Sequence, residues 1–329
     1  MLFKALLLEQ SGTTTVSRIT ELDESSLPSG EVTVQIDFSS LNYKDGLAIT
    51  GKSPVVRAWP MVPGIDFAGK VHSSSDERFS VGDRVVLNGW GVGESRWGGL
   101  AQYARVPANY LVPLPMGLST MQAMVIGTAG YTAMLAVQAL EHAGVKPSMG
   151  ECLVTGANGG VGGFAIALLA GRGFHVVAST GRIEESIRLR ELGAAEVVDR
   201  ATLNQKGKPL QKERWAGVID SVGGQTLANA CAASQYAGVV AACGLAESME
   251  FPVTVAPFIL RGVTLAGIDS VQAPYARRIS AWSQLAKEIS HEKIHNMTSG
   301  VINLEHSIAA AQDLLDGKIK GRMVVDPNI

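Results

Sequence analysis

The chain has 329 residues, of which 46% are hydrophobic and 18% charged, so it can bury a sizeable core and is not an intrinsically disordered protein. This length favours two domains of about 150 residues each. The formal net charge of −2 gives no basic excess for binding nucleic acid or an anionic membrane surface. The three cysteines are scattered and form no disulfide framework, which indicates a reducing compartment and a cytoplasmic location.

The first 120 residues or so have the pattern of a β-rich domain. Met1–Gln10 is expected to be a first strand and not a signal peptide, because Lys4 and Glu9 interrupt it and no small-residue cleavage site follows. Val32–Phe38 alternates apolar and polar residues, as a half-buried strand does. Further strands are predicted at Gly64–Val71 and Asp83–Leu87, between glycines and prolines. The pattern favours a small barrel over a helix bundle.

A segment without charged residues runs between Arg105 and Glu141. Its second part, Met121–Leu140, has the length of a membrane span, which needs about 20 predominantly apolar residues. Glycine, threonine and glutamine dilute this run. We therefore predict a buried pair of helices here and no membrane partner.

From about residue 121 onward, helical patterns alternate with short apolar strands. This alternation is typical of βαβ units and predicts an α/β fold with a parallel sheet. The tail is expected to add a helix over Tyr275–Ile289 and a strand over Met323–Val325. The expected strands of the sheet are Glu151–Thr155, Phe174–Ser179, Glu196–Asp199, Ala216–Asp220 and Gly238–Cys243, with helices at Val161–Arg172, Ile183–Leu192 and Leu227–Ser234.

The sharpest local signal is a glycine-rich turn, Thr155–Gly163, which follows a predicted strand and opens a predicted helix. A dinucleotide-binding fingerprint needs this context, because the turn must be tight and its backbone must approach a pyrophosphate. The N-terminus of the following helix offers free N–H groups and a positive dipole end to the phosphates. We interpret the turn as a cofactor site.

The residues after the second strand of this unit indicate which dinucleotide is bound. An NADH site usually has an acidic residue here to hold the ribose 2′-hydroxyl. This chain has Ser179–Arg182 instead, with no acid. Arginine and small hydroxyl residues suit a 2′-phosphate, so we predict NADPH. Arg182 would bind the phosphate, the alternative being an ordinary surface arginine at the start of a helix, and Arg200 could reach the same phosphate from the side.

No set of residues has the spacing of a catalytic zinc site, which needs three protein ligands, commonly Cys and His. His291 and His295 are four residues apart, but their segment is polar and they are expected to be solvated. We predict no metal.

Several stretches together carry a family likeness over nearly the whole chain. They resemble the medium-chain dehydrogenase/reductase superfamily, in its quinone-oxidoreductase branch and its acrylyl-CoA reductase subfamily. The stretches are Ser40–Asp45, Pro63–Gly69, Gly89–Glu94, Trp97–Gly99, Ile126–Gly130, Ala242–Ala246 and Pro257–Val263.

The resemblance implies a fold of two domains. A GroES-like β-barrel catalytic domain would comprise residues 1–121 and 270–329, and a Rossmann domain with a doubly wound parallel sheet would comprise residues 122–269. Nicotinamide and substrate would lie in the cleft between them. The resemblance also implies a homodimer, with Thr264–Gly267 pairing across a two-fold axis.

By motif match the resemblance also implies site residues. Tyr43 would border the nicotinamide and donate a hydrogen bond in catalysis; Asp45 would orient a group in the same step, or cap a helix. Arg322 would close the site, or lie at the surface beside a strand. Trp90 and Trp97 could cover the acyl end of the cleft. The remaining residues would bind the cofactor. The pyrophosphate would be bound by Asn158, Gly159, Gly160 and Val161, and the 2′-phosphate by Thr180, Gly181, Arg182 and Arg200. The nicotinamide end would be bound by Leu245, Ile259 and Ser270, and Thr128, in the stretch Ile126–Gly130, is a further cofactor-binding residue.

The implied reaction is NADPH-dependent reduction of the C=C bond of acryloyl-CoA, or another short enoyl-CoA, to propionyl-CoA. Hydride would reach the β-carbon, and the charge that builds on the thioester oxygen would need hydrogen-bond donors placed in advance. The same fold and cofactor would serve an NADPH:quinone oxidoreductase, which is the first alternative. A non-enzymatic, zeta-crystallin-like binding protein is the second.

Overall fold

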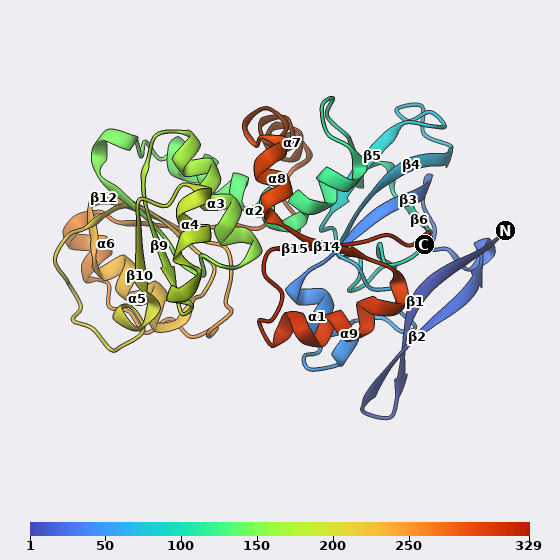
Figure 1. The fold of residues 1–329 in the computed structure, drawn as a ribbon, viewed down its shortest axis with the longest axis horizontal. Coiled ribbons are helices and arrows are strands. Elements are labelled where there is room, and N and C mark those ends of the chain that lie inside the picture. Colours follow the sequence, from blue (N-terminus) through green and yellow to red (C-terminus); the bar gives the residue numbers. More distant parts are fainter. The chain divides into compact units, whose positions relative to one another are not determined.

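The computed structural model describes residues 1–329 and divides into two compact units. Unit 1 comprises Met1–Thr128, Ser270–Ala286 and Ile294–Ile329. Unit 2 comprises Ala129–Asp269 and Lys287–Lys293. Each has its own sheet, and Figure 1 labels most of the elements of both.

Unit 1 is built mainly on antiparallel strands, with β14 and β15 as a parallel pair, and it also contains helices. β1 and β2 form a separate two-stranded sheet, and a seven-stranded sheet has the order β14-β15-β3-β4-β5-β7, with β6 paired to β3. The predicted strands are confirmed, with β3 and β4 longer than expected. The strands are β1 (Leu2–Ser11), β2 (Thr14–Asp23), β3 (Val32–Leu41), β4 (Asp66–Ser74), β5 (Arg84–Asn88), β6 (Tyr103–Val106), β7 (Val112–Pro113), β14 (Thr298–Ile302) and β15 (Arg322–Val325); the helices are α1 (Tyr43–Thr50), α7 (Tyr275–Glu288, in unit 1 as far as Ala286) and α9 (Leu304–Leu315).

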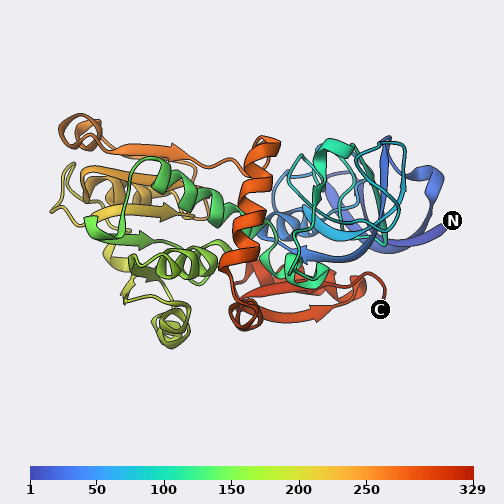
Figure 2. The ribbon, with the colours of Figure 1, turned by 90° about the horizontal axis from the view of Figure 1, so that it is seen from above.

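Unit 2 is a six-stranded parallel sheet with the order β10-β9-β8-β11-β12-β13. This is the doubly wound order 3-2-1-4-5-6, so the predicted α/β fold is confirmed. β8, β9 and β11 are almost entirely buried because helices cover both faces of such a sheet, whereas β13 lies at its edge (Figure 2, orange). The strands are β8 (Glu151–Val154), β9 (His175–Thr180), β10 (Glu196–Asp199), β11 (Trp215–Asp220), β12 (Ser234–Ala242) and β13 (Thr264–Gly267); the helices are α3 (Gly160–Gly171), α4 (Ser186–Leu192), α5 (Gly224–Ala232) and α6 (Ala256–Arg261).

The chain passes from unit 1 to unit 2 within the apolar segment α2, Thr120–His142. This helix is long and apolar enough to cross a membrane by length and composition, but 89% of its most hydrophobic window is buried inside the protein, as in a core helix. Gly127 breaks it with φ +51° and ψ −158°, so two helices meet there. The predicted buried helix pair is confirmed.

The tail helix α7 differs from the prediction in which residues it buries. Trp282 and Leu285 are buried as expected, but Ile279 is only half-buried. Arg278, on the same face, is 2% exposed because it hydrogen-bonds to the carbonyls of Asn88, Val271 and Ala273. In α8 (His291–Met297), His291 and His295 are exposed, as predicted.

Candidate functional site

The carboxyl ends of β8 and β11 mark the point in unit 2 where the order of the sheet reverses. Ligands of doubly wound folds bind at such a switch point. The hydroxyl of Thr155, after β8, donates to Asp220 Oδ1 at the end of β11 over 2.6 Å. Asp220 also accepts from the N–H groups of Val222 and Gly223, so both turns are held open in fixed positions.

The glycine-rich turn after β8 has the predicted close-packed geometry. Gly156 has φ +59°, which a residue with a side chain rarely adopts. A Cβ on Gly162 would clash with the Gly156 carbonyl oxygen and lie 2.7 Å from Ala157 Cα, so only glycine lets α3 approach the turn. Gly159, the N-cap of α3, supplies no capping side chain, and the first N–H groups of the helix are left for an anion.

Asn158 carries a further polar group into this turn. Its side chain is 7% exposed, and its Nδ2 donates to Thr180 Oγ1 over 2.7 Å. Its Oδ1 is buried without a hydrogen-bond partner. An orphaned acceptor of this kind fits a ligand donor such as a ribose hydroxyl, so the turn has the groups that a dinucleotide requires.

Three arginines surround the turn after β9, where an acid would select NADH. Arg200 lies against Gly181: a Cβ added to Gly181 would be 2.5 Å from Arg200 Nε. Arg182 Nε is 3.2 Å from Glu185 Oε1. Arg188 Nη1 is buried without a hydrogen-bond partner, and burial lowers the pKa of this guanidinium while Glu185 opposes the shift. Arg182, Arg188 and Arg200 thus supply three cations for a phosphate near this turn, while Glu185 contacts Arg182 and Asp199 lies opposite Thr180 on the neighbouring strand.

Sequence reasoning missed both Glu185 and Arg188 at this end. They lie within the segment predicted as a single helix, Ile183–Leu192, which is a 3₁₀ turn up to Glu185 followed by α4. The 3₁₀ turn places Glu185 beside Arg182 at i+3. Ser179–Arg182 itself contains no acid, but Glu185 partly neutralises Arg182.

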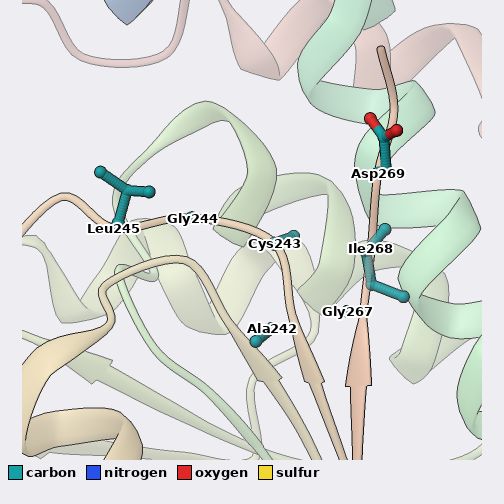
Figure 3. A pocket seen from close by; sticks show the side chains of 7 residues that line it. All are labelled: Ala242, Cys243, Gly244, Leu245, Gly267, Ile268 and Asp269. Carbon is teal, nitrogen blue, oxygen red and sulfur yellow. The ribbon is translucent and has the colours of Figure 1, made fainter. Parts of the chain in front are cut away.

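A pocket of about 460 Å³ opens between the segments that follow β12 and β13, the two strands at the opposite side of the sheet from β10. Figure 3 shows Leu245 and Asp269 beyond the ends of these strands. The Cys243 thiol donates to the Asp220 carbonyl, and burial raises its pKa to about 12, so it remains neutral. Leu245, predicted to lie at the nicotinamide end, is one of the residues that line the pocket. Ile259, on α6, is 72% exposed and is not among the lining residues.

In unit 1 the predicted catalytic residues lie at the first turn of α1. Tyr43 is the first helical residue and is 52% exposed. Asp45 is 1% exposed, and its carboxylate accepts from the N–H groups of Asn42, Gly64 and Ile65 over 2.9–3.1 Å. Burial raises the pKa of Asp45 to about 7, with Asp66 adding to the shift. In the structure Asp45 therefore caps the helix, which was the second of its two predicted roles. Its side chain faces inward and stabilises the turn on which Tyr43 lies.

Asp66, which sequence reasoning did not single out as a site residue, is the centre of a buried polar network. Its Oδ1 accepts from Ser40 Oγ, and its Oδ2 from Asn42 Nδ2 and from the N–H and hydroxyl of Thr128, over 2.7–3.0 Å. Arg322 Nη2 donates to Ser40 Oγ and Asn42 Oδ1. Arg322 is 5% exposed, so the alternative of a surface residue beside a strand is wrong for it.

This network explains the break in α2. A Cβ on Gly127 would lie 2.8 Å from Arg322 Nη2 and 3.0 Å from Asp66 Oδ2. The network therefore needs glycine next to Thr128. Ser270, the remaining predicted cofactor residue, is half-buried, and its carbonyl accepts from Arg278.

Two family models match the chain. Residues 28–116 match the alcohol dehydrogenase GroES-like domain, and residues 160–290 match the zinc-binding dehydrogenase family. Relatives match over the full length. The probable acrylyl-CoA reductase AcuI of Escherichia coli is 50% identical over 99% of this chain and 100% of its own. The acrylyl-CoA reductase AcuI of Ruegeria pomeroyi is also 50% identical, over the same shares of both chains. The putative quinone oxidoreductase YhfP of Bacillus subtilis is 43% identical over 98% of each chain.

Two solved structures are similar over almost the whole chain. The yhdH oxidoreductase of Salmonella enterica in complex with NADP has a TM-score of 0.96 and 50% identity, covering 98% of this chain and 99% of its own. Bacillus subtilis yhfP with NAD bound has a TM-score of 0.95 and 43% identity, covering 99% of both chains.

The zinc in the name of the second family model has no matching donor set in this chain. No group of three or more His, Cys, Asp or Glu side chains is placed to hold a metal ion. The residues present do not fit a catalytic zinc site, which needs three protein ligands.

Proposed function

Because the chain belongs to the medium-chain dehydrogenase/reductase superfamily, and within it to the acrylyl-CoA reductase family, we propose that it reduces acryloyl-CoA to propionyl-CoA with NADPH. The observation that carries the proposal is the 50% identity, over 99% of this chain, to two relatives with that name. Unit 1 would be the catalytic domain and unit 2 the cofactor domain.

The geometry of unit 2 supports a proposed set of cofactor residues. Asn158 and the N–H groups of Gly160 and Val161 would bind the pyrophosphate and its riboses. Gly159, whose own N–H donates to the Gly156 carbonyl, would contribute as an N-cap without a side chain that could block the phosphate. Thr180, Gly181, Arg182 and Arg200 would surround the 2′-phosphate, with Arg188 beside them. The three arginines near Gly181 support NADPH, although the relative at 43% identity was solved with NAD. The pocket at Leu245 would receive the nicotinamide end. Ile259 is proposed for this end on its motif alone. Bound NADPH supplies a hydride.

The substrate gains negative charge on its thioester oxygen when hydride reaches the β-carbon, and it needs a donor there. Tyr43 is our candidate, since a phenol can donate a hydrogen bond without carrying a charge of its own. It is half exposed at the first turn of α1, which the Asp45 carboxylate caps. The turn that carries Tyr43 would be held in place by the buried polar side chains of Asp45, Asp66, Thr128 and Arg322. Ser270 would contribute through its position in the loop whose carbonyls bind Arg278.

No step of this reaction needs a metal, because an alkene conjugated to a thioester is already electrophilic. The chain also has no group of three or more His, Cys, Asp or Glu side chains placed to hold a metal ion, and we propose a zinc-independent enzyme.

Quinone reduction is the second candidate, supported by the 43% identity to YhfP, which is named a putative quinone oxidoreductase. The two functions are separated by turnover with acryloyl-CoA, crotonyl-CoA and 1,4-benzoquinone, each with NADPH. The proposed function predicts the highest kcat/KM for acryloyl-CoA, about tenfold or more above crotonyl-CoA. A higher value for benzoquinone would favour quinone reduction.

We also propose a cytoplasmic homodimer. The three cysteines are unpaired, as in a reducing compartment. β13 is an edge strand whose outer hydrogen-bonding side is open to a second copy, and Leu265 on it is 37% exposed. Light scattering would give twice the 34.6 kDa chain mass for a dimer.

A further inference from the structure

Asp220, the last residue of β11, is a buried acid that is not among the predicted site residues. It is fully buried, and its carboxylate is held by three uncharged donors. These are the Thr155 hydroxyl on Oδ1, at 2.6 Å, and the N–H groups of Val222 and Gly223 on Oδ2, at 3.2 and 2.8 Å. A buried carboxylate without a basic partner is unfavourable for folding, which favours a functional role for it.

One carboxylate oxygen holds the start of the glycine-rich turn. The Thr155 hydroxyl, which donates to Asp220, also accepts from the Ser221 backbone N–H over 3.2 Å. The Ser221 hydroxyl donates to the Thr155 carbonyl over 3.2 Å, and a Cβ on Gly156 would clash with it. The turn is therefore held against the end of β11 through both the backbone and the side chain of Thr155.

The backbone at the end of β11 holds the segment that lines the pocket. The Asp220 carbonyl accepts from the Cys243 backbone N–H over 2.8 Å and from the Cys243 thiol over 3.2 Å. A Cβ on Gly244 would lie 2.5 Å from the Ser221 carbonyl oxygen, so only glycine fits there. Cys243, Gly244 and Leu245 follow one another along the pocket in Figure 3. Asp220 and Ser221 thus contact both the glycine-rich turn and the pocket segment.

Resting on the proposed cofactor site, with the pyrophosphate at the glycine-rich turn and the nicotinamide at the Leu245 pocket, we propose that Asp220 is a positioning residue that sets these two ends relative to each other. Its side chain fixes the turn, and its carbonyl fixes the pocket segment. A ligand that spans both ends binds more tightly when they are already in place. Because Asp220 is fully buried, it acts through Thr155 and Cys243.

Charge and position predict opposite effects for the isosteric variant Asp220→Asn. A carboxylate near a pyrophosphate repels it, so loss of the charge alone would tighten binding. Loss of position would weaken it. With the amide oxygen on the two N–H groups of the Val222–Gly223 turn, the amide NH2 would face the Thr155 hydroxyl. That hydroxyl already accepts from Ser221 and would lose the acceptor of its own proton.

Calorimetry with three ligands of increasing length tests the proposal: adenosine 2′,5′-bisphosphate, 2′-phospho-ADP-ribose and NADPH. The more of the two ends a ligand spans, the more its binding should depend on Asp220. Asp220→Asn should weaken NADPH by about tenfold or more, 2′-phospho-ADP-ribose less, and the bisphosphate by no more than about threefold. Unchanged or tighter NADPH binding would overturn the proposal, and so would an equal loss for all three ligands, which indicates a general loosening of the fold.

Thr155→Val removes the same hydrogen bond without changing the charge, and it decides the matter if Asp220→Asn does not fold. It should reproduce the graded loss, and Thr155→Ser, which restores the hydroxyl, should recover most of the affinity. A Thr155→Val variant that binds NADPH as tightly as the wild type would overturn the proposal.

Ser234→Ala is the matched control for the loss of a buried hydrogen bond in unit 2. Ser234 is fully buried at the start of β12, and its hydroxyl donates to the Ala230 carbonyl over 2.9 Å. Ligands of this fold bind at the carboxyl ends of the strands, so this variant should lower stability and leave the three affinities within about twofold of the wild type. The same graded loss in Ser234→Ala would overturn the assignment to Asp220.

These binding measurements need no acyl-CoA, so they separate the positioning role from the reaction. A wild type that binds NADPH no more tightly than adenosine 2′,5′-bisphosphate would overturn the Asp220 proposal, because the far end would then contribute nothing. A graded loss in a protein that reduces no enoyl-CoA would support the Asp220 proposal and overturn the proposed function.

Discussion

Replacing Arg182 by alanine should weaken NADPH binding and leave NADH binding nearly unchanged. A charge-assisted hydrogen bond to a phosphate contributes about 1.5–3 kcal/mol. At about 1.4 kcal/mol per factor of ten, its loss corresponds to roughly 10- to 150-fold in the dissociation constant. NADH has no 2′-phosphate, so its dissociation constant should change by less than about threefold on the same reasoning.

The surroundings of Arg182 place the effect in the upper part of that range. Glu185 Oε1 lies 3.2 Å from Arg182 Nε, so the variant leaves a buried carboxylate without this partner beside the phosphate. Arg188 and Arg200 remain, so binding should weaken without being abolished. We expect a loss of about 30- to 150-fold, or roughly 2–3 kcal/mol.

Fluorescence titration of each reduced dinucleotide measures the two constants directly. Arg190→Ala is the matched control, because Arg190 lies on α4 but its guanidinium bonds the Ala195 carbonyl. If only the arginines near Gly181 bind the 2′-phosphate, Arg190→Ala should change the dissociation constants of NADPH and NADH by no more than about twofold. An equal loss of NADPH and NADH binding in Arg182→Ala would show that Arg182 supports the fold, and it would refute the 2′-phosphate assignment.

Three further predictions concern the turn, the donor and the metal. Gly162→Ala, whose Cβ would clash with the Gly156 carbonyl oxygen, should destabilise the protein by about 1–3 kcal/mol in denaturant unfolding and weaken both dinucleotides; unchanged affinity would contradict the close-packed turn. Tyr43→Phe should lower kcat for acryloyl-CoA by about 10- to 100-fold with little change in KM, and a change in KM alone would remove the donor role. Dialysis against a strong chelator should leave turnover unchanged, whereas activity that disappears and returns with zinc would contradict the prediction of a metal-independent enzyme.

Local chain order was enough to predict the cofactor half of the fold. The strand, glycine turn and helix at residues 151–171 are contiguous, and each glycine requirement is local, so the pattern predicts the structure found at β8 and α3. The same holds for the alternation that predicted β9 to β12: both ends of β10 are exact, and the ends of the other strands differ by at most four residues.

The polar network of unit 1 could not be predicted in this way. Asp66 and Arg322 are brought together by strand pairing, since β15 pairs with β3 and β3 with β4. Neither residue has a local pattern that signals burial, and a charged side chain beside a strand is usually solvated. The break at Gly127 has the same origin, because it depends on the side chains of Arg322, Ser40 and Asp66.

The most direct test of the central claim is the amount of propionyl-CoA formed per NADPH oxidised when acryloyl-CoA is the only acceptor. The account predicts one propionyl-CoA, identified by mass spectrometry, for each NADPH consumed. NADPH consumption without propionyl-CoA, or no consumption with acryloyl-CoA while benzoquinone is reduced, would contradict it.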